Sequence, residues 1–450
     1  MDRRNFVAAS CLGLGSALAT RAAGKAANAP QVEAILPRSR VPLSFIIDDS
    51  TCLVNMGHFC MPQFAEAWPE REVYRQPWQD WPREIPDSFV REFGEWCAGA
   101  GVKGKYSIVP YPACVGWLDR GLPGWSRPQL ERSLALVREL MLPNWDIHPE
   151  MVTHTRVIDL KTGRPMEKAT AATMENSYPQ SDVSVDHLTE YLALALRILK
   201  NCGLPCEGIT TPGGFGNRIK PKLPVAVHQA VRDVFGSELP HYFKYVVSGD
   251  ESTEPKLEYT SDSKSVADLT VNVPAGTGDW FGGWEGTRTV EADKYCNADA
   301  TKGRMVELIR RGEPAVMLCH WPGMYCNGEK TGFQEFQRVV LALKSRFDRQ
   351  TVWMKVSEIG RYWAAKETTE LVADGSGVRA NAAIDCRDFT FRYSGNIAHD
   401  FTWTSGSSAS KLKRVERIDQ LKEGTFVKND QVAVLCVRLL AGLNRLNAQS

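Results

Sequence analysis

Hydrophobic and polar positions along this chain form short apolar runs that alternate with stretches of helical periodicity. The first run, Leu43–Ile47, predicts a buried β-strand. In the segment that Asp87 opens, apolar residues recur at i, i+4, i+7 and i+8 from Phe89, which predicts an amphipathic helix with Asp87 as its cap. A long loop rich in Trp and Pro is predicted between Cys52 and Pro86.

The same alternation continues as far as residue 365. Further strands are predicted over residues 105–109, 145–147, 208–211, 315–319 and 351–356, and further helices over 130–141, 186–199, 302–311, 333–347 and 357–365. Alternating strands and helices are typical of a parallel sheet with helical crossovers. Seven or eight such repeats favour a closed or nearly closed barrel over an open sheet.

The pattern changes after Glu370. Residues 389–393 and 401–403 alternate between apolar and polar, and residues 432–437 form an apolar run. The sequence therefore predicts an α/β fold in which a (β/α)7-type barrel over residues 35–368 is followed by a small β-rich C-terminal domain over residues 370–450.

Residues 1–29 are predicted to be a targeting segment rather than part of the fold. Arg3 and Arg4 precede a Gly/Ala-rich apolar stretch, and Ala17–Ala19 offers small residues for cleavage. This arrangement resembles a twin-arginine export signal, which implies a periplasmic or extracellular protein. A weak membrane anchor and a chance basic start are the alternatives.

Composition excludes several classes of protein. The chain has 54 Lys+Arg and 53 Asp+Glu, a net charge of +1, which argues against nucleic-acid binding by bulk charge. No apolar run is long enough for a membrane-spanning helix, so stable membrane insertion is not expected. The Gly-rich segment 211–216 lacks the spacing of a dinucleotide-binding loop. The oligomeric state is left open.

The cysteines and tryptophans leave alternatives open. The 12 cysteines include no Cys-x-x-Cys pair, so a zinc ribbon is not indicated, and both disulfides and buried free thiols are compatible with export. The 13 tryptophans are many for this length; Trp forms platforms for sugars, with core packing as the alternative.

Polar residues with catalytic chemistry follow several of the predicted strands. In a barrel the carboxyl ends of the strands meet at one rim, where loops carry the active site. One carboxylate and two imidazoles can hold a divalent ion such as Zn²⁺, with one position left for water. A second carboxylate can take a proton from that water, and a further His can protonate a leaving group. The candidates at strand ends are Asp48, Asp49, His148, His154 and His320.

These motifs resemble the polysaccharide deacetylases of the chitooligosaccharide-deacetylase type. In that family a strand ends in Asp-Asp, as residues 45–50 do here, and residues 101–109 resemble its second strand. A Pro-containing motif after a middle strand corresponds to Thr211–Gly213, and a late Leu-x-His corresponds to Leu318–His320. The resemblance covers residues 40 to 365 and implies a (β/α)7-type barrel.

The resemblance also implies the roles of the site residues. Asp48 corresponds to the catalytic base and His320 to the catalytic acid, while Asp49, His148 and His154 correspond to the ligands of a divalent metal, for which Zn²⁺ is expected. The competing interpretation makes Asp48 a second metal ligand or a turn former, and His320 a structural histidine packed against its neighbour.

The chain departs from the family pattern at four points, one of which is the long Trp-rich insertion near residues 52–86. The two family histidines are spaced i, i+4, whereas His148 and His154 are six residues apart, about 240° around a helix, so they can converge only through a loop. Thr211 stands where the family has an Arg, and Ser50 stands where it commonly has a Gly.

Further residues are candidates for substrate binding. Trp280 and Trp284 belong to a Gly-rich segment that resembles a loop placing aromatic rings over a sugar, with a packed turn as the alternative. Arg218 lies in a short basic patch suited to an anionic sugar, Pro212 follows a predicted strand, and His58 could line the site or replace a ligand. Ordinary solvated loops are the alternative for Arg218 and His58.

Taken with the resemblance, these features predict an exported, metal-dependent carbohydrate hydrolase that removes acetyl groups from a polysaccharide or oligosaccharide. A glycoside hydrolase or polysaccharide lyase on the same barrel is the first alternative, and it would need a pair of carboxylates flanking a glycosidic bond. A non-catalytic carbohydrate-binding protein is the second.

Overall fold

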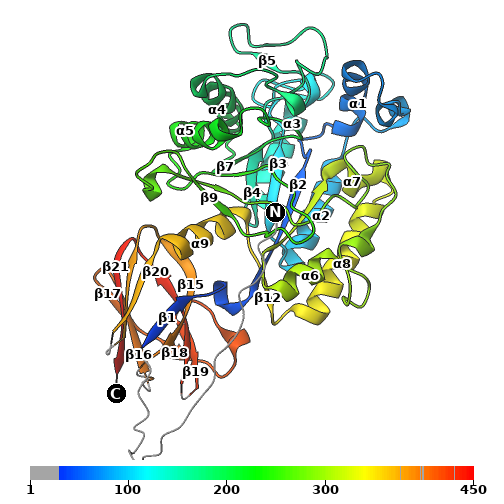
Figure 1. Cartoon of the computed structure of the whole chain (residues 1–450). Coiled ribbons are helices and arrows are strands. Elements are labelled where there is room, and N and C mark those ends of the chain that lie inside the picture. The colour runs from blue at the N-terminus through cyan, green and yellow to red at the C-terminus, as the bar shows by residue number, and fades with distance from the viewer. Residues whose placement is uncertain (1–29, 375–376, 396, 398–399, 430, 450) are drawn as a thin grey trace, which may run out of the picture.

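The protein has a mixed α/β fold with parallel strands (Figure 1). The computed structural model describes residues 30–374, 377–395, 397, 400–429 and 431–449, so the predicted signal over residues 1–29 lies outside the described residues. Within those ranges, no helix combines the length and the apolar character needed to cross a bilayer.

Strands and helices alternate through residues 41–368, as the sequence pattern predicts. The strands are β2 (Val41–Asp48), β3 (Gly104–Ile108), β4 (Trp145–Pro149), β7 (Gly208–Thr210), β8 (His241–Phe243), β9 (Lys256–Tyr259), β10 (Leu269–Asn272), β11 (Ala315–His320) and β12 (Thr351–Trp353), with a small hairpin of β5 (Ile158–Asp159) and β6 (Arg164–Pro165). The helices are α1 (Met56–Ala67), α2 (Asp87–Ala100), α3 (Arg127–Leu136), α4 (Val185–Asn201), α5 (Leu223–Phe235), α6 (Arg304–Arg311), α7 (Trp321–Tyr325), α8 (Thr331–Phe347) and α9 (Val356–Thr368).

The strands of this region belong to two sheets rather than to one continuous barrel sheet. One sheet has the parallel order β11-β2-β3-β4, with β12 pairing with β2; the other has the order β7-β8-β10-β9, in which β9 is antiparallel. The sheets meet at a parallel bridge between Glu150 and Thr210, and the amide of Gly276 donates to the carbonyl oxygen of Val316 at 2.9 Å. Parallel strands with covering helices are therefore confirmed.

The sequence pattern did not predict strands β5, β6, β8, β9 and β10 or helices α1, α5 and α7. Strands β8 and β10 have only three and four residues, too short for an apolar run to be distinguished from a loop. Helix α1 occupies part of the predicted loop between Cys52 and Pro86, which was therefore wrong as a continuous loop. Its sequence contains Gly57 and Pro62, two residues of low helix propensity, which conceal the helix from pattern analysis.

Strand β2 forms the centre of the α/β core. All eight of its residues are buried, as expected for a parallel strand covered on both faces. Phe45 stacks on Phe336 of α8 with ring centroids 4.4 Å apart, and it also lies against Trp145 of β4. This packing ties β2 to its neighbours and sets the position of the residues that follow Ile47.

The C-terminal region consists of two five-stranded sheets, beside the α/β part in Figure 1. The sheet orders are β1-β15-β20-β19-β18 and β13-β14-β21-β16-β17. The strands are β13 (Glu370–Asp374), β14 (Gly377–Ala382), β15 (Cys386–Ser394), β16 (Asp400–Ser405), β17 (Ser408–Lys411), β18 (Lys413–Arg414), β19 (Thr425–Lys428), β20 (Ala433–Leu439) and β21 (Gly442–Gln449). Strand β1 (Gln31–Ala34), from the beginning of the described chain, pairs antiparallel with β15.

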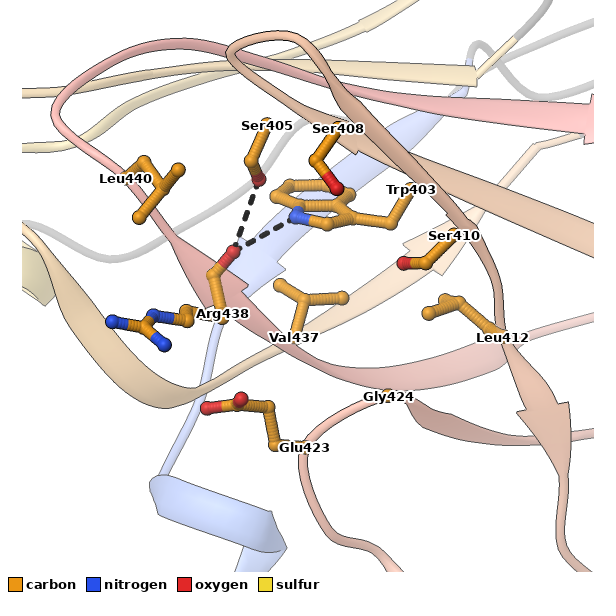
Figure 2. Close-up of a pocket in the computed structure, with 10 residues that line it drawn as sticks. All are labelled: Trp403, Ser405, Ser408, Ser410, Leu412, Glu423, Gly424, Val437, Arg438 and Leu440. Atoms are coloured by element: carbon orange, nitrogen blue, oxygen red, sulfur yellow. Dashed lines mark hydrogen bonds between the residues drawn. The ribbon is translucent and has the colours of Figure 1, made fainter.

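A crevice of about 510 Å³ lies in this C-terminal region (Figure 2). The indole N–H of Trp403 and the hydroxyl of Ser405 both donate to the carbonyl oxygen of Arg438, at 2.9 and 3.2 Å, and these hydrogen bonds connect the two sheets. The Trp403 side chain is buried, with 4% of the residue exposed, so it does not offer a ring face on which a sugar could stack.

The described cysteines are all free thiols, and ten of these eleven are buried. Burial raises the pKa of Cys60 to about 11 and that of Cys52 to about 12, which keeps both protonated and unreactive at neutral pH. The sequence left both disulfides and buried free thiols open; the described cysteines are free thiols, and most are buried.

Candidate functional site

The carboxyl ends of the parallel strands carry a cluster of charged side chains. Asp48 is the last residue of β2, and the strand register places it directly beside His320, the last residue of β11. Asp49 follows at once and has a left-handed backbone, with φ of 57°. Because β2 and β11 are adjacent, Asp48, Asp49 and His320 lie on the same rim, as predicted from their positions after strands.

Asp49, Glu150 and His154 form one group of close side chains on this rim. The Nε2 atom of His154 lies 2.8 Å from Oδ1 of Asp49 and 3.3 Å from Oε1 of Glu150. The other oxygen of Glu150, Oε2, accepts a hydrogen bond of 2.7 Å from the backbone amide of Asp49. All three side chains are buried, and their donor atoms lie within 4.8 Å of one another, which suits the ligands of one ion.

The contacts within this group fit a metal better than they fit an ordinary ion pair. Oδ1 of Asp49 is buried and has no hydrogen-bond partner among the described residues, although Nε2 of His154 lies close to it. Oδ1 of Asp49 and Nε2 of His154 are therefore close to each other but not aligned as a hydrogen bond, an arrangement that suits two ligands of one ion. Both residues also have left-handed backbones, with φ of 57° and 63°, and such strain is typical of functional sites.

Electrostatics hold a positive charge at His154 in the absence of an ion. Burial alone lowers the pKa of His154, but the Asp49 carboxylate, the Cys60 thiol and Glu150 outweigh it, and the pKa is raised well above its usual value. A divalent cation would take the place of this proton, because a metal-ligating imidazole is neutral.

His148 does not belong to this group. Its Nε2 atom lies 2.8 Å from Nε2 of His241, and its Nδ1 atom lies 3.4 Å from the hydroxyl oxygen of Thr210. Glu150, directly after the end of β4, instead approaches Asp49 and His154. The spacing of Glu150 and His154 is i, i+4, the spacing that the family resemblance implies for its two histidines.

The group Asp146, His148 and His241, in which the two histidines are buried, is the second set of described side chains that could hold an ion. Here, however, each side chain has a hydrogen-bond partner in the protein. The two rings face each other, and the carboxylate of Asp146 accepts from the backbone amide and the hydroxyl of Ser357, at 2.7 and 2.8 Å. Burial lowers the pKa of His241 to about 4 and that of His148 well below its usual value, so this pair is neutral.

Asp48 forms a buried ion pair with Lys105 of the neighbouring strand β3. The Lys105 ammonium group donates to Oδ1 of Asp48, to the hydroxyl of Ser107 at 2.8 Å and to the carbonyl oxygen of Ile47 at 3.3 Å. Burial and the Glu150 carboxylate raise the pKa of Asp48, while Lys105 and His320 lower it; the net shift is upward. A carboxylate with a raised pKa is a better proton acceptor when it is ionised.

His320 is oriented by Asp279. Its Nδ1 atom lies 2.7 Å from Oδ2 of Asp279, and its side chain is 24% exposed, more than the other charged side chains of the rim. Burial lowers the pKa of His320, but the hydrogen bond with Asp279 and the charges of Asp49, Asp279 and Asp48 raise it, with a net value of about 9. The imidazole is therefore protonated at neutral pH, as a proton donor requires. The ring of Trp321, the neighbour named in the competing interpretation, packs against Phe89, Phe93 and Tyr106.

Trp284 is the substrate-binding candidate whose link to the metal group can be traced through ring contacts. Its half-buried ring lies edge-on to Phe64 of α1, with centroids 5.1 Å apart, and Phe64 lies 6.2 Å from the ring of His154. Trp280 is half-buried and packs on Tyr295, whose hydroxyl accepts from the Trp280 amide at 2.8 Å.

The remaining candidates have local partners. Nδ1 of His58 lies 3.0 Å from the carbonyl oxygen of Trp81, and His58 is absent from both groups of possible metal ligands in the described residues. Pro212 is buried in the loop after β7. Arg218 is exposed and donates to the carbonyl oxygen of Gln180 at 2.8 Å, a surface position.

Sequence reasoning missed three residues of the site, and each had a signal. Glu150 stands four residues before His154, which is a ligand spacing. Lys105 is a charged residue inside a predicted buried strand, where a charge needs a partner. Asp279 opens the aromatic segment before Trp280, but its sequence position does not reveal that it reaches His320.

Comparisons with known proteins give only distant similarities. No protein-family profile and no curated protein matches the sequence. Among solved structures, a protein from Mycobacterium smegmatis described as a candidate polysaccharide deacetylase is 12% identical, with a TM-score of 0.40. The alignment covers 76% of this chain and 97% of the Mycobacterium smegmatis chain.

Two glycoside hydrolases are also similar at this distant level. A family 39 glycoside hydrolase from Bacteroides cellulosilyticus is 11% identical with a TM-score of 0.21, covering 92% of this chain and 82% of its own. The catalytic domain of GH30 xylanase C from Talaromyces cellulolyticus is 9% identical with a TM-score of 0.27, covering 93% and 100%. All these scores are too low to carry a conclusion about fold or function.

Proposed function

We propose that this protein is an exported, metal-dependent hydrolase that removes acetyl groups from a polysaccharide or oligosaccharide. The observation that carries the proposal is the convergence of three pairs on one rim: His154 with Asp49, Asp48 with Lys105, and His320 with Asp279. They supply a metal-binding group, a proton acceptor and a proton donor, the set of functions that metal-assisted hydrolysis of an ester or amide requires.

Asp49, Glu150 and His154 would hold the ion. A divalent ion bound there would polarise the substrate carbonyl and increase the acidity of a water molecule. The sequence predicts Zn²⁺ bound by one carboxylate and two imidazoles. The group proposed here has two carboxylates and one imidazole, and carboxylate oxygens also suit Mn²⁺ and other hard cations. We therefore propose a divalent ion and leave Zn²⁺ as one candidate among those to be compared.

Asp48 and His320 carry out the proton transfers in this proposal. Lys105 favours the ionised form of Asp48, which would accept a proton from the attacking water. His320, protonated at neutral pH with a pKa of about 9, donates a proton to the departing sugar oxygen or nitrogen. Asp279 orients the His320 ring and compensates its positive charge.

The same proposal includes the finer features of fold and location. We infer that β2, β3, β4, β7, β8, β10 and β11 make up a (β/α)7-type barrel, supported by the two contacts between the sheets. The barrel covers residues 35–368 and the β-rich domain residues 370–450. Trp284 and Trp280 would bind the sugar chain, and residues 1–29 would direct the protein to the periplasm or the extracellular space.

The test is an activity panel with metal-depleted protein that is reloaded with Zn²⁺, Co²⁺ or Mn²⁺. Acetylated glycans and matched unacetylated glycans are assayed for released acetate and for new reducing ends. We expect acetate release that depends on the ion and no new reducing ends. Chain cleavage without acetate would support a glycoside hydrolase instead, new unsaturated ends would support a lyase, and glycan binding without either reaction would support a non-catalytic protein.

A further inference from the structure

The segment that carries His154 has an unusual backbone. Met151 and His154 both have left-handed conformations, with φ of 52° and 63°, and neither is a glycine. For residues with a side chain this conformation costs of the order of 1–3 kcal/mol each, so it persists only where surrounding contacts hold it. The segment lies between β4 and the β5–β6 hairpin and includes no helix or strand that would supply those contacts.

The amides of Tyr111 and Ala113 donate to the carbonyl oxygens of Val152 and Thr153, at 2.8 and 3.0 Å, and the buried side chain of Glu175 binds the amides of the same segment. Its Oε1 atom accepts from the amide of Val152 at 3.1 Å, and its Oε2 atom accepts from the amides of Thr153 and His154 at 3.0 and 2.6 Å. The hydroxyl of Tyr191, on α4, also donates to Oε1. Glu175 is completely buried, and its own amide donates to the carbonyl oxygen of Thr155 at 2.6 Å.

The chemistry of this arrangement requires a carboxylate. Three main-chain N–H groups and one O–H group point at the same side chain, and all of them are donors. A carboxylate can accept hydrogen bonds at both of its oxygens, whereas an amide of the same size would direct its NH₂ group against some of these donors. Burial makes the loss of these hydrogen bonds costly, because no water replaces them.

We propose that Glu175 is a positioning residue that sets the direction of His154 toward the metal ion. The inference rests on the proposed function, because it concerns the same metal-binding group. Glu175 has no direct contact with Asp49 or Glu150 among the described hydrogen bonds; it acts through the amide of the ligand residue itself. The hydrogen bond to this amide fixes the φ of His154 and hence the direction in which its imidazole leaves the backbone.

The test compares Glu175→Gln with the wild type and with a matched control. Glu258→Gln is that control, because Glu258 also accepts from a tyrosine hydroxyl, that of Tyr242 at 2.5 Å, but it lies on β9 away from the segment that carries His154. Co²⁺ affinity is measured by chelator competition, and the visible absorption of bound Co²⁺ reports its coordination geometry. Hydrogen exchange of residues 151–155 is followed in the metal-free proteins.

We expect Glu175→Gln to weaken Co²⁺ binding by about 10–100-fold, the usual effect of losing a partner that orients a ligand. Its Co²⁺ spectrum should change, and exchange in residues 151–155 should increase, while Glu258→Gln retains wild-type affinity and spectrum. A folded Glu175→Gln protein with wild-type affinity and spectrum would overturn the inference even if its melting temperature falls, because a merely structural role predicts that result.

A second variant covers the case in which Glu175→Gln does not fold. Tyr191→Phe removes one donor and leaves the three amide bonds, so we expect a folded protein whose Co²⁺ affinity is a few-fold weaker. Unchanged affinity and spectrum in this variant would overturn the inference. Failure of the wild type to bind any divalent ion would overturn the proposed function together with it, whereas unchanged affinity in the variants overturns the positioning role alone.

Discussion

The ammonium group of Lys105 donates to the carboxylate of Asp48, across the boundary between strands β3 and β2. Both side chains are almost completely withdrawn from solvent, with 0% and 8% exposed. Asp48 also lies near the Glu150 carboxylate, which raises its pKa, so Lys105 supplies the positive charge that this acidic rim needs. The family resemblance implies an Arg at position 211 after a different strand, where this chain has Thr211.

Removing Lys105 should destabilise the protein strongly. Lys105→Met leaves the Asp48 carboxylate buried and without its cation, and we expect the free energy of unfolding to fall by about 3–5 kcal/mol in urea denaturation. The double variant Lys105→Met/Asp48→Asn should regain part of this loss, because no charge is left unpaired. If Lys105→Met is as stable as the wild type, the ion pair between Lys105 and Asp48 does not form in solution.

Replacing the proposed base should separate catalysis from metal binding. Asp48→Asn is expected to lower kcat by roughly 10²–10⁴-fold while the metal content per protein remains nearly unchanged. Kinetics on an acetylated glycan and metal analysis of the same preparation check this. Loss of the metal in Asp48→Asn would favour the competing role of Asp48 as a ligand.

Glu150 and His148 should differ in their effect on metal binding. Glu150→Gln removes a proposed ligand charge, and we expect Co²⁺ affinity to fall by at least about 10-fold. His148→Gln is the control, since its ring faces His241 and is absent from the Asp49 group. Titration of both metal-free variants with Co²⁺ shows which of the two residues contributes to metal affinity. Wild-type affinity in Glu150→Gln with weak binding in His148→Gln would restore the assignment of His148 as a ligand.

The pH dependence should reveal the pairing of His320 with Asp279. In the metal-free protein the pKa of His320 is about 9, above its ordinary value of 6.5, so its proton is bound more tightly in the folded state. The resulting stabilisation is complete below about pH 6.5 and is lost as the pH rises toward 9. Asp279→Asn should lower this pKa and reduce the loss of stability across that range.

The same variant should shift the kinetic profile. Because His320 donates its proton, kcat/KM is expected to fall at alkaline pH, and in Asp279→Asn the fall should occur at lower pH than in the wild type. NMR titration of the histidine ring and pH–rate profiles provide the two measurements. Identical alkaline limbs in the two proteins would argue against His320 as the acid.

Export is predicted to depend on the paired arginines. Arg3→Lys/Arg4→Lys should retain the chain in the cytoplasm, because the twin-arginine receptor recognises the two guanidinium groups. Fractionation of cells that produce each form is the measurement. Normal export of the Lys-Lys form would indicate an ordinary secretory signal.

Much of the α/β framework could be predicted from local pattern. The apolar run before Asp48 and the helical spacing from Phe89 depend on burial of one face or one stripe, which sequence periodicity records directly. Strands β8 and β10 escaped prediction because a run of three or four residues has no measurable period. The hydrogen bonds that link the two sheets involve residues far apart in the chain and leave no local pattern.

For the site, the sequence by itself determined which residues stand at strand ends: Asp48, Asp49 and His320 reach one rim because parallel strands end on the same side. The tertiary structure alone decided which side chains meet there. The side chain of His148 points toward His241, so Glu150 accompanies His154, and Glu175 holds the loop between them. The physical reason is that a side chain's direction depends on strand register and backbone angles, which are set by contacts distant in sequence.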